Sequence, residues 1–235
     1  MKKTHLLAIL FFSGAWGLSE AVLGDTLYAR QVPFASVLLT IVAFVLLAVA
    51  RPFLPRWGGA TAIGLLAMLY KCLNVPFFGC HLTGIAALGV SWDLVFGLAS
   101  RGWSFRGFAD PVASGVGGVG GEGTRVWFRN SALGAAAAYL GYVLFVLAMV
   151  FVFRSEHWVQ KGLTGALQHV FVSGSLAAAG CAVVVPLGLR LGERESGRAA
   201  VPGLLGLRPR LGAAIAGFAA LGLWVYGVVG KILRG

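Results

Sequence analysis

The stretch PFASVLLTIVAFVLLAVA at residues 33–50 decides the class of the protein. It carries no ionisable side chain, and as an α-helix it would rise about 27 Å, close to the roughly 30 Å hydrocarbon core of a bilayer. The sequence therefore predicts an all-α fold, a polytopic transmembrane helix bundle of seven spans in a single integral membrane domain. Six spans are the alternative, with one segment interfacial or re-entrant. The other six candidate spans lie near residues 5–24, 58–76, 81–99, 131–153, 169–189 and 211–233.

The composition agrees with a membrane protein. Of the 235 residues, 58% are hydrophobic and 11% are charged, whereas soluble domains carry about 25% charged residues. A disordered chain is excluded, because disorder needs low hydrophobicity. The formal net charge of +11 comes from basic residues in short runs between apolar segments. Nucleic-acid binding needs basic residues clustered on a solvated face, so we expect membrane lipids, and no nucleic acid, as partners.

The basic residues also predict the orientation, because Lys and Arg accumulate on the cytoplasmic side of a membrane. With a cytoplasmic N-terminus, most of them fall on the inside. We therefore expect a multi-pass protein of a bacterial-type plasma (inner) membrane, with its C-terminus outside if the spans number seven. The basic residues left on the outer side would be Arg30, Arg154, Lys161, Lys231 and Arg234.

The first segment has a competing interpretation. Lys2 and Lys3, followed by an apolar stretch and small residues, resemble a secretory signal peptide. The apolar run continues past Ala15, however, which favours a retained first helix.

Three connecting segments carry further expectations. A Gly-rich cytoplasmic loop at residues 109–124 should be flexible. Its G-x-G-x-x-G run at residues 115–120 follows no strand, so a dinucleotide site is not predicted. Residues 154–168 could form a short amphipathic helix at the outer interface, and residues 190–210 are predicted to be a solvated inner connector.

Ionisable residues within the spans point to function. A charge at mid-bilayer costs about 2.5–3.5 kcal/mol on insertion scales, so it normally pairs inside the bundle or marks a pathway. A helix rises about 1.5 Å per residue, so the position of a residue in its span gives its depth in the membrane. By this measure Asp93 lies in the inner half, and the other polar residues of the spans lie in the outer half. We expect a polar cavity that opens outward, with the candidate binding residues Trp16, Glu20, Lys71, Asn74, His81 and His169, and Asp93 as a separate candidate.

The helix faces favour interior positions for these groups. Small residues recur at three- and four-residue steps beside Glu20, Lys71 and Asp93, and such stripes let helices approach closely in lipid. The span at 33–50 has only Ser36 and Thr40 as polar groups, which predicts a lipid-facing scaffold.

Structural explanations stay open for the same residues. Glu20 and Lys71 could form an ion pair that locks two helices, and Lys71 could extend outward to the interface. Asp93 could cap a helix or accept a hydrogen bond from a backbone amide. A structural membrane subunit with a buried ion pair is therefore one alternative function.

No catalytic arrangement of nucleophile and base is found, so an enzyme is not expected. The favoured function is capture of a small polar metabolite from the outer side for uptake. In that hypothesis Lys71 would pair with a carboxylate or phosphate, Glu20 with an amine or hydroxyl, and Trp16 would stack on a ring. We expect no metal or cofactor; the alternative is a membrane anchor of a redox complex, with haem held by His81 and His169.

Two stretches resemble the substrate-binding (S) components of energy-coupling-factor (ECF) vitamin transporters. They are WGLSEAVLG at 16–24 and LAMLYKCLNVPFFGCHLTGIAALGVSWDLVFGL at 66–98. The resemblance implies a chain without its own ATPase, a partner membrane subunit and two cytoplasmic ATPases, with residues 101–129 and 190–210 facing the partner. The chain departs from the family in its seven predicted spans, against the family's usual six. Lys2 also stands where nickel and cobalt members have histidine.

Overall fold

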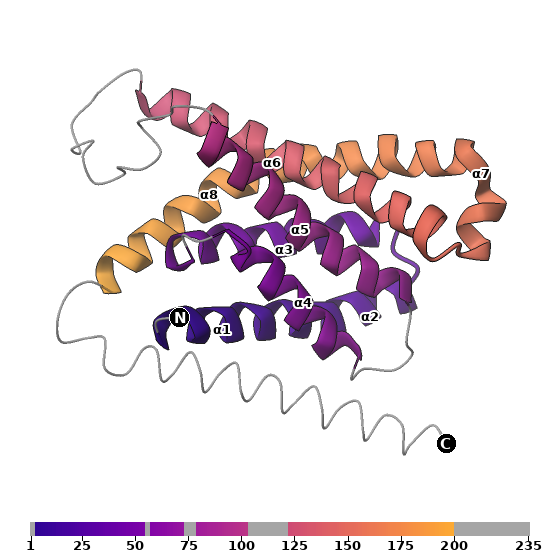
Figure 1. The fold of residues 1–235 in the computed structure, drawn as a ribbon, viewed down its shortest axis with the longest axis horizontal. Coiled ribbons are helices and arrows are strands. Elements are labelled where there is room, and N and C mark those ends of the chain that lie inside the picture. The colour runs from indigo at the N-terminus through magenta and orange to yellow at the C-terminus, as the bar shows by residue number, and fades with distance from the viewer. Residues whose placement is uncertain (1–2, 55–56, 73–78, 103–121, 200–235) are drawn as a thin grey trace, which may run out of the picture.

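A computed structural model describes residues 3–54, 57–72, 79–102 and 122–199, and throughout these ranges the regular structure is helical (Figure 1). Several helices contain a short π-helical or 3-10 segment, labelled η. The elements are α1 (Lys3–Ser19), η1 (Glu20–Gly24), α2 (Asp25–Ala29), α3 (Ala35–Ala50), η2 (Arg51–Phe53), α4 (Gly59–Cys72), α5 (Gly79–Gly102), α6 (Glu122–Leu147), η3 (Ala148–Val152), α7 (Glu156–His169), η4 (Val170–Gly174) and α8 (Ser175–Ala199).

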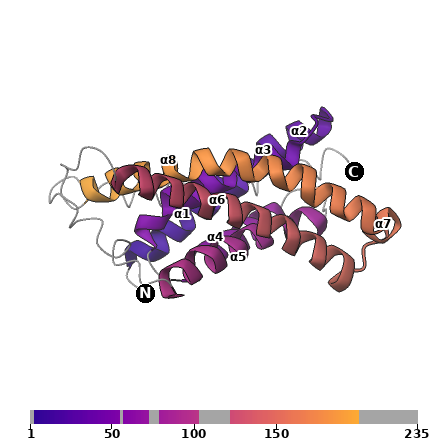
Figure 2. The ribbon, with the colours of Figure 1, turned by 90° about the horizontal axis from the view of Figure 1, so that it is seen from above.

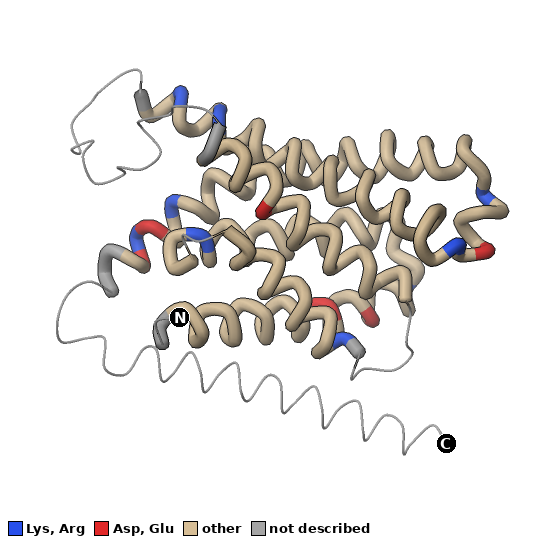
Figure 3. The backbone as a smooth tube through the Cα atoms, in the orientation of Figure 1, with Lys and Arg blue, Asp and Glu red and all other residues tan. Residues whose placement is uncertain are grey.

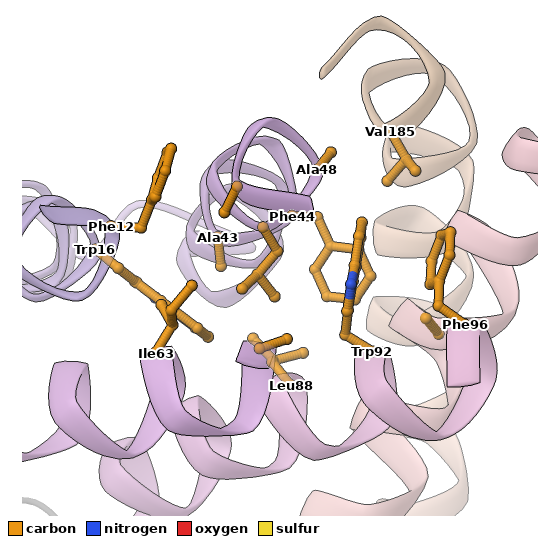
Figure 4. Close-up of a cluster of buried hydrophobic side chains, with 14 of the residues drawn as sticks. Phe12, Trp16, Ala43, Phe44, Ala48, Ile63, Leu88, Trp92, Phe96 and Val185 are labelled. Carbon is orange, nitrogen blue, oxygen red and sulfur yellow. The ribbon is translucent and has the colours of Figure 1, made fainter. Parts of the chain in front are cut away.

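The long helices run side by side along the length of the molecule, as two perpendicular views show (Figures 1 and 2). Helix α4 packs against α1 and α5, α6 packs against α5 and α8, and α8 packs against α3. The core between them is aromatic and aliphatic (Figure 4). Its largest fully buried side chains include Trp16 of α1, Phe44 of α3, Ile63 of α4, and Trp92 and Phe96 of α5.

Five helical stretches among the described residues are long and apolar enough to cross a membrane, which is compatible with a membrane protein. A sixth apolar helix, Gly59–Lys71, is shorter than the predicted span at 58–76. The predicted span at 211–233 and most of the loop at 109–124 lie outside the described residues. The five long stretches are His5–Ala29, Ala35–Phe53, Gly79–Ser100, Gly123–Val152 and Glu156–Ser196.

Two predicted boundaries are wrong. The described end of the Gly-rich loop, residues 122–124, already belongs to α6, and the first part of the predicted connector at 190–210 belongs to α8. The predicted amphipathic segment at 154–168 does form a helix, α7, although it continues through η4 into α8 rather than ending. Helix α7 contains one non-helical residue, Gly162, at φ 63°.

Helix α3 is not the lipid-facing scaffold predicted for residues 33–50. It packs between α1 and α8 and buries Phe44 completely. The burial of α3 follows from the residues of its neighbour α8. A Cβ atom added at Gly192 of α8 would lie 2.5 Å from the Val49 carbonyl oxygen of α3, so only glycine allows this approach. Glycines on α8 thus bring the two backbones together, and α3 itself carries no polarity difference that could reveal its buried side.

The small-residue stripes predicted beside the ionisable groups are largely confirmed. Ser13, Gly17 and Gly24 are buried near Glu20, and a Cβ atom at Gly17 would lie 2.8 Å from Cβ of Tyr70. Among the described residues, most Lys, Arg, Asp and Glu positions lie toward the two ends of the helices, and few lie in the middle (Figure 3).

Substitution of Gly89 tests the contact between α4 and α5. A Cβ atom there would lie 2.8 Å from the Ala60 carbonyl oxygen, and backbone atoms cannot move aside easily. We expect Gly89→Ala to lower the free energy of unfolding by about 1–3 kcal/mol, measured by SDS titration in mild detergent. Gly123→Ala is the control, since nothing lies within 4 Å of its added Cβ; equal stability of the two variants would contradict the packing described.

Candidate functional site

A cavity of about 340 Å³ is lined in part by residues of α2 and α7. These two helices lie at the same end of the bundle (Figures 1 and 2). Helices α3, α5 and α6 form the walls of the cavity, η1 and α2 contribute one side, and α7 contributes another. Most of its lining is apolar, with a small number of polar groups among it. The polar and aromatic lining residues are Glu20, Tyr28, Ser36, Thr40, His81, Tyr142, Phe145, His157, Trp158 and His169.

Among the lining residues in the described part of the chain, Glu20 brings the only carboxylate. It begins the π-helical segment η1 and is 6% exposed. The indole Nε1 of Trp16 donates a hydrogen bond to Oε1 of Glu20 at 3.3 Å. Trp16 is fully buried and does not line the cavity. Trp16 therefore lies behind the Glu20 carboxylate and holds it, whereas the sequence hypothesis gave Trp16 the role of stacking on a ring of the guest.

Lys71 takes a different position from the one expected. Its Nζ atom lies 2.6 Å from Oδ1 of Asp25 and donates a second hydrogen bond to the Glu20 carbonyl oxygen at 3.1 Å. It is not among the residues that line the cavity. The structural alternative paired Lys71 with Glu20, but the ion pair in the structure joins Lys71 to Asp25, one residue beyond the predicted first span.

Aromatic rings surround both predicted histidines. His81 of α5 stacks on Tyr28 of α2, with ring centroids 4.5 Å apart. His169, the last residue of α7, lies against Trp158 and Tyr142 at centroid distances of 5.1 and 5.4 Å. Because Trp158 also comes from α7, this helix closes one side of the cavity with an aromatic surface.

A group of hydroxyls forms another wall. Thr40 of α3 donates its hydroxyl proton to the Ser36 carbonyl oxygen at 2.8 Å. Tyr142 of α6 is 5% exposed, and its hydroxyl lies close to the hydroxyls of Ser36 and Thr40 but makes no hydrogen bond of good geometry within the part of the chain that the structure describes. A buried unsatisfied hydroxyl costs about 1–3 kcal/mol, so such a group calls for an explanation such as a bound molecule.

Asp93 does not line the cavity. Its Oδ2 accepts a hydrogen bond from the backbone N–H of Thr61 at 2.7 Å, and its carbonyl oxygen accepts one from the indole of Trp57 at 3.0 Å. Thr61 lies in the first turn of α4, where backbone N–H groups lack helical partners. Asp93 therefore caps α4 from the neighbouring helix, which is the structural alternative foreseen for it.

The predicted site residues thus separate into groups. Glu20, His81 and His169 meet at one cavity, Trp16 and Lys71 lie behind it, and Asp93 belongs to another contact. Asn74 lies outside the described residues. The chain ranges that are described contain no group of three or more His, Cys, Asp or Glu that could hold a metal ion.

Comparison with protein-family models, with curated proteins and with solved structures finds no match.

Asp93 offers a test of its structural role. Asp93→Leu leaves the half-buried backbone N–H of Thr61 without its partner, so we expect the free energy of unfolding to fall by about 1–3 kcal/mol. Asp93→Asn keeps an oxygen acceptor and should lose less. Thermal unfolding in detergent measures both; equal losses would contradict the capping role, and a loss of ligand retention in a folded Asp93→Asn would favour a pathway through Asp93.

Proposed function

We propose that the protein is an integral membrane protein that captures a small metabolite from the outer side for uptake, without an ATPase of its own. The observation that carries the proposal is the cavity beside Glu20 and Tyr142. Sites for small molecules have volumes of about 300–1,000 Å³ and mostly apolar linings with a few convergent polar groups. The volume of about 340 Å³, the buried carboxylate and the unpartnered hydroxyl all agree with such a site.

The distribution of charge supports an outward-facing cavity. Arginines cluster at the end away from α2 and α7, where η2 begins, α6 begins and α8 ends (Figure 3). Arg51, Arg129 and Arg190 are among them. Since Lys and Arg are enriched on the cytoplasmic side, this end is the inner one in our proposal. The cavity then faces outward, the N-terminus is cytoplasmic, and the spans number six or seven.

Energy for uptake would come from other subunits. The sequence contains no G-x-x-x-x-G-K-[ST] loop, the pattern that cradles nucleotide phosphates in many ATPases. The resemblance to S components of ECF transporters adds a partner membrane subunit and a pair of cytoplasmic ATPases to the proposal. Their contact would be sought on the arginine-rich inner end.

A haem-binding redox anchor is the second candidate, because His81 and His169 line the same cavity from different helices. Imidazoles on two helices are a common means of axial haem ligation. A structural subunit is favoured only by the Lys71–Asp25 pair, which does not account for the cavity.

Filling the cavity tests the proposed capture. A Cβ atom at Gly84 would meet Phe145 at 3.8 Å, an ordinary contact, so Gly84→Leu should fold and place its side chain in the cavity. We expect it to abolish retention of small molecules from a pooled metabolite mixture, detected by mass spectrometry after gel filtration, and Gly84→Ala to keep most of it.

Two results would contradict this prediction. Equal retention by Gly84→Leu and Gly84→Ala would place binding elsewhere, and no retention by the unmodified protein would remove the capture function. A Soret absorption band in the purified protein, lost in His81→Ala, would favour the haem anchor instead.

The orientation is testable by labelling intact cells with a membrane-impermeant maleimide. Val159 of α7 is 54% exposed, and Arg194 of α8 is exposed near the opposite end. With the native cysteines replaced, we expect Val159→Cys to be labelled directly and Arg194→Cys only after permeabilisation. The reverse pattern would invert the proposed topology.

A further inference from the structure

The charges beside the cavity do not balance. Glu20 and Asp25 carry two negative charges, and Lys71 carries one positive charge that lies against Asp25 at 2.6 Å. The described lining residues include no Lys or Arg. Lys161 of α7 is exposed, and its Nζ atom lies over the Trp158 ring, 4.9 Å from the centroid, where it forms no ion pair with the Glu20 carboxylate. The group formed by Glu20, Asp25 and Lys71, hereafter the Glu20 locus, therefore carries a formal charge of −1 among the described residues when both carboxyl groups are ionised.

A buried carboxylate is stable as an anion only beside positive charge and otherwise takes up a proton, because removal of an isolated charge from water is unfavourable. The indole of Trp16 is a neutral donor at 3.3 Å, and the Lys71 ammonium, which is bonded to Asp25, attenuates the Glu20 charge from nearby without an ion pair to its carboxylate. A guest with one positive charge would neutralise the locus. A guest carboxylate, in contrast, would meet Glu20 and find the Lys71 ammonium already engaged by Asp25.

The aromatic lining of the cavity indicates the chemical nature of the uncharged part of the guest. Tyr28, Phe145, Trp158 and the histidines present ring faces and edges to the cavity. Aromatic faces attract cations and pack well on other rings. A bare metal ion would leave most of a 340 Å³ apolar space unfilled, so the cation should carry an organic body. The unpartnered hydroxyl of Tyr142 is available for a second polar atom.

We propose that the cavity takes a small organic cation, a protonated amine on a ring-bearing body, with its nitrogen against the Glu20 carboxylate and its ring among the aromatic side chains. This inference rests on the proposed capture function and narrows its substrate class. The sequence hypothesis expected a guest with both kinds of charge, whose carboxylate or phosphate would pair with Lys71. The present inference differs, because Lys71 is already paired with Asp25.

A matched set of probes tests the charge directly. Tryptamine, tryptophol and indole-3-acetate share one ring and differ in a cationic, neutral or anionic side chain. Calorimetric titration of the full-length protein in detergent at neutral pH should rank them in that order. Because a hydrogen bond to a charged group contributes about 1.5–3 kcal/mol, tryptamine should bind about ten- to a hundredfold more tightly than tryptophol.

Glu20→Gln provides the matched variant. It keeps the shape and an oxygen acceptor for Trp16 but removes the charge, so the preference for tryptamine over tryptophol should disappear while tryptophol affinity stays unchanged. Glu193→Gln, an exposed acid near the far end of α8, should change neither. If Glu20→Gln fails to fold, the ranking of the three probes on the unmodified protein still decides the question.

The outcomes separate this inference from the capture function. Binding of tryptophol or indole-3-acetate as tight as that of tryptamine, or no binding of tryptamine, overturns the charge assignment. A metabolite retained from the pool without a positive charge overturns it too, and leaves capture standing. If none of the three probes binds and no metabolite is retained from the pooled mixture, both the cation preference and the capture function are overturned.

Discussion

The ammonium group of Lys71 ties α4 to the junction of η1 and α2, and the cavity depends on this contact. By pairing with Asp25 and donating to the Glu20 carbonyl oxygen, it fixes the backbone where α1 changes to a π-helical register. The same bond directs the Lys71 ammonium to Asp25 and not to the Glu20 side chain. The carboxylate, held by the Trp16 indole, then borders the cavity with no ion pair to any residue that the structure describes.

π-Helical segments gather around this end of the molecule. Glu20 begins η1, and His169 directly precedes η4, so two of the cavity's chemical groups lie where a helix departs from α geometry. The segment η3 ends α6 just before the turn into α7. Such one-turn bulges recur at functional sites because they shift side chains out of the regular helical positions. Here they turn groups from otherwise apolar helices toward a common space.

The sequence predicted this site in part, and the limits are physical. Ionisable residues in apolar helices are conspicuous, so Glu20, His81 and His169 could be found, and the depth argument brought them to one end. The partner of Lys71 could not be found in this way, because Asp25 lies just beyond the predicted apolar span and was not considered among the residues within the spans. Ser36, Thr40 and Tyr142 were missed as lining residues, since hydroxyls are common in membrane helices. The burial of α3 was missed because α8 glycines, not α3 residues, determine it.

The two buried acids show what separates a site from a structural contact. Asp93 and Glu20 are similarly buried, at 3% and 6% exposure, and either could be taken for a functional carboxylate. Asp93 accepts a short hydrogen bond from a helix N-terminus at 2.7 Å, and a helix N-terminus also bears partial positive charge. Glu20 receives one neutral indole N–H at 3.3 Å and borders open volume. Burial alone therefore does not distinguish the two acids. They differ in that Asp93 has a positively polarised partner, the N-terminus of α4, whereas Glu20 has a single neutral donor and lies beside the cavity.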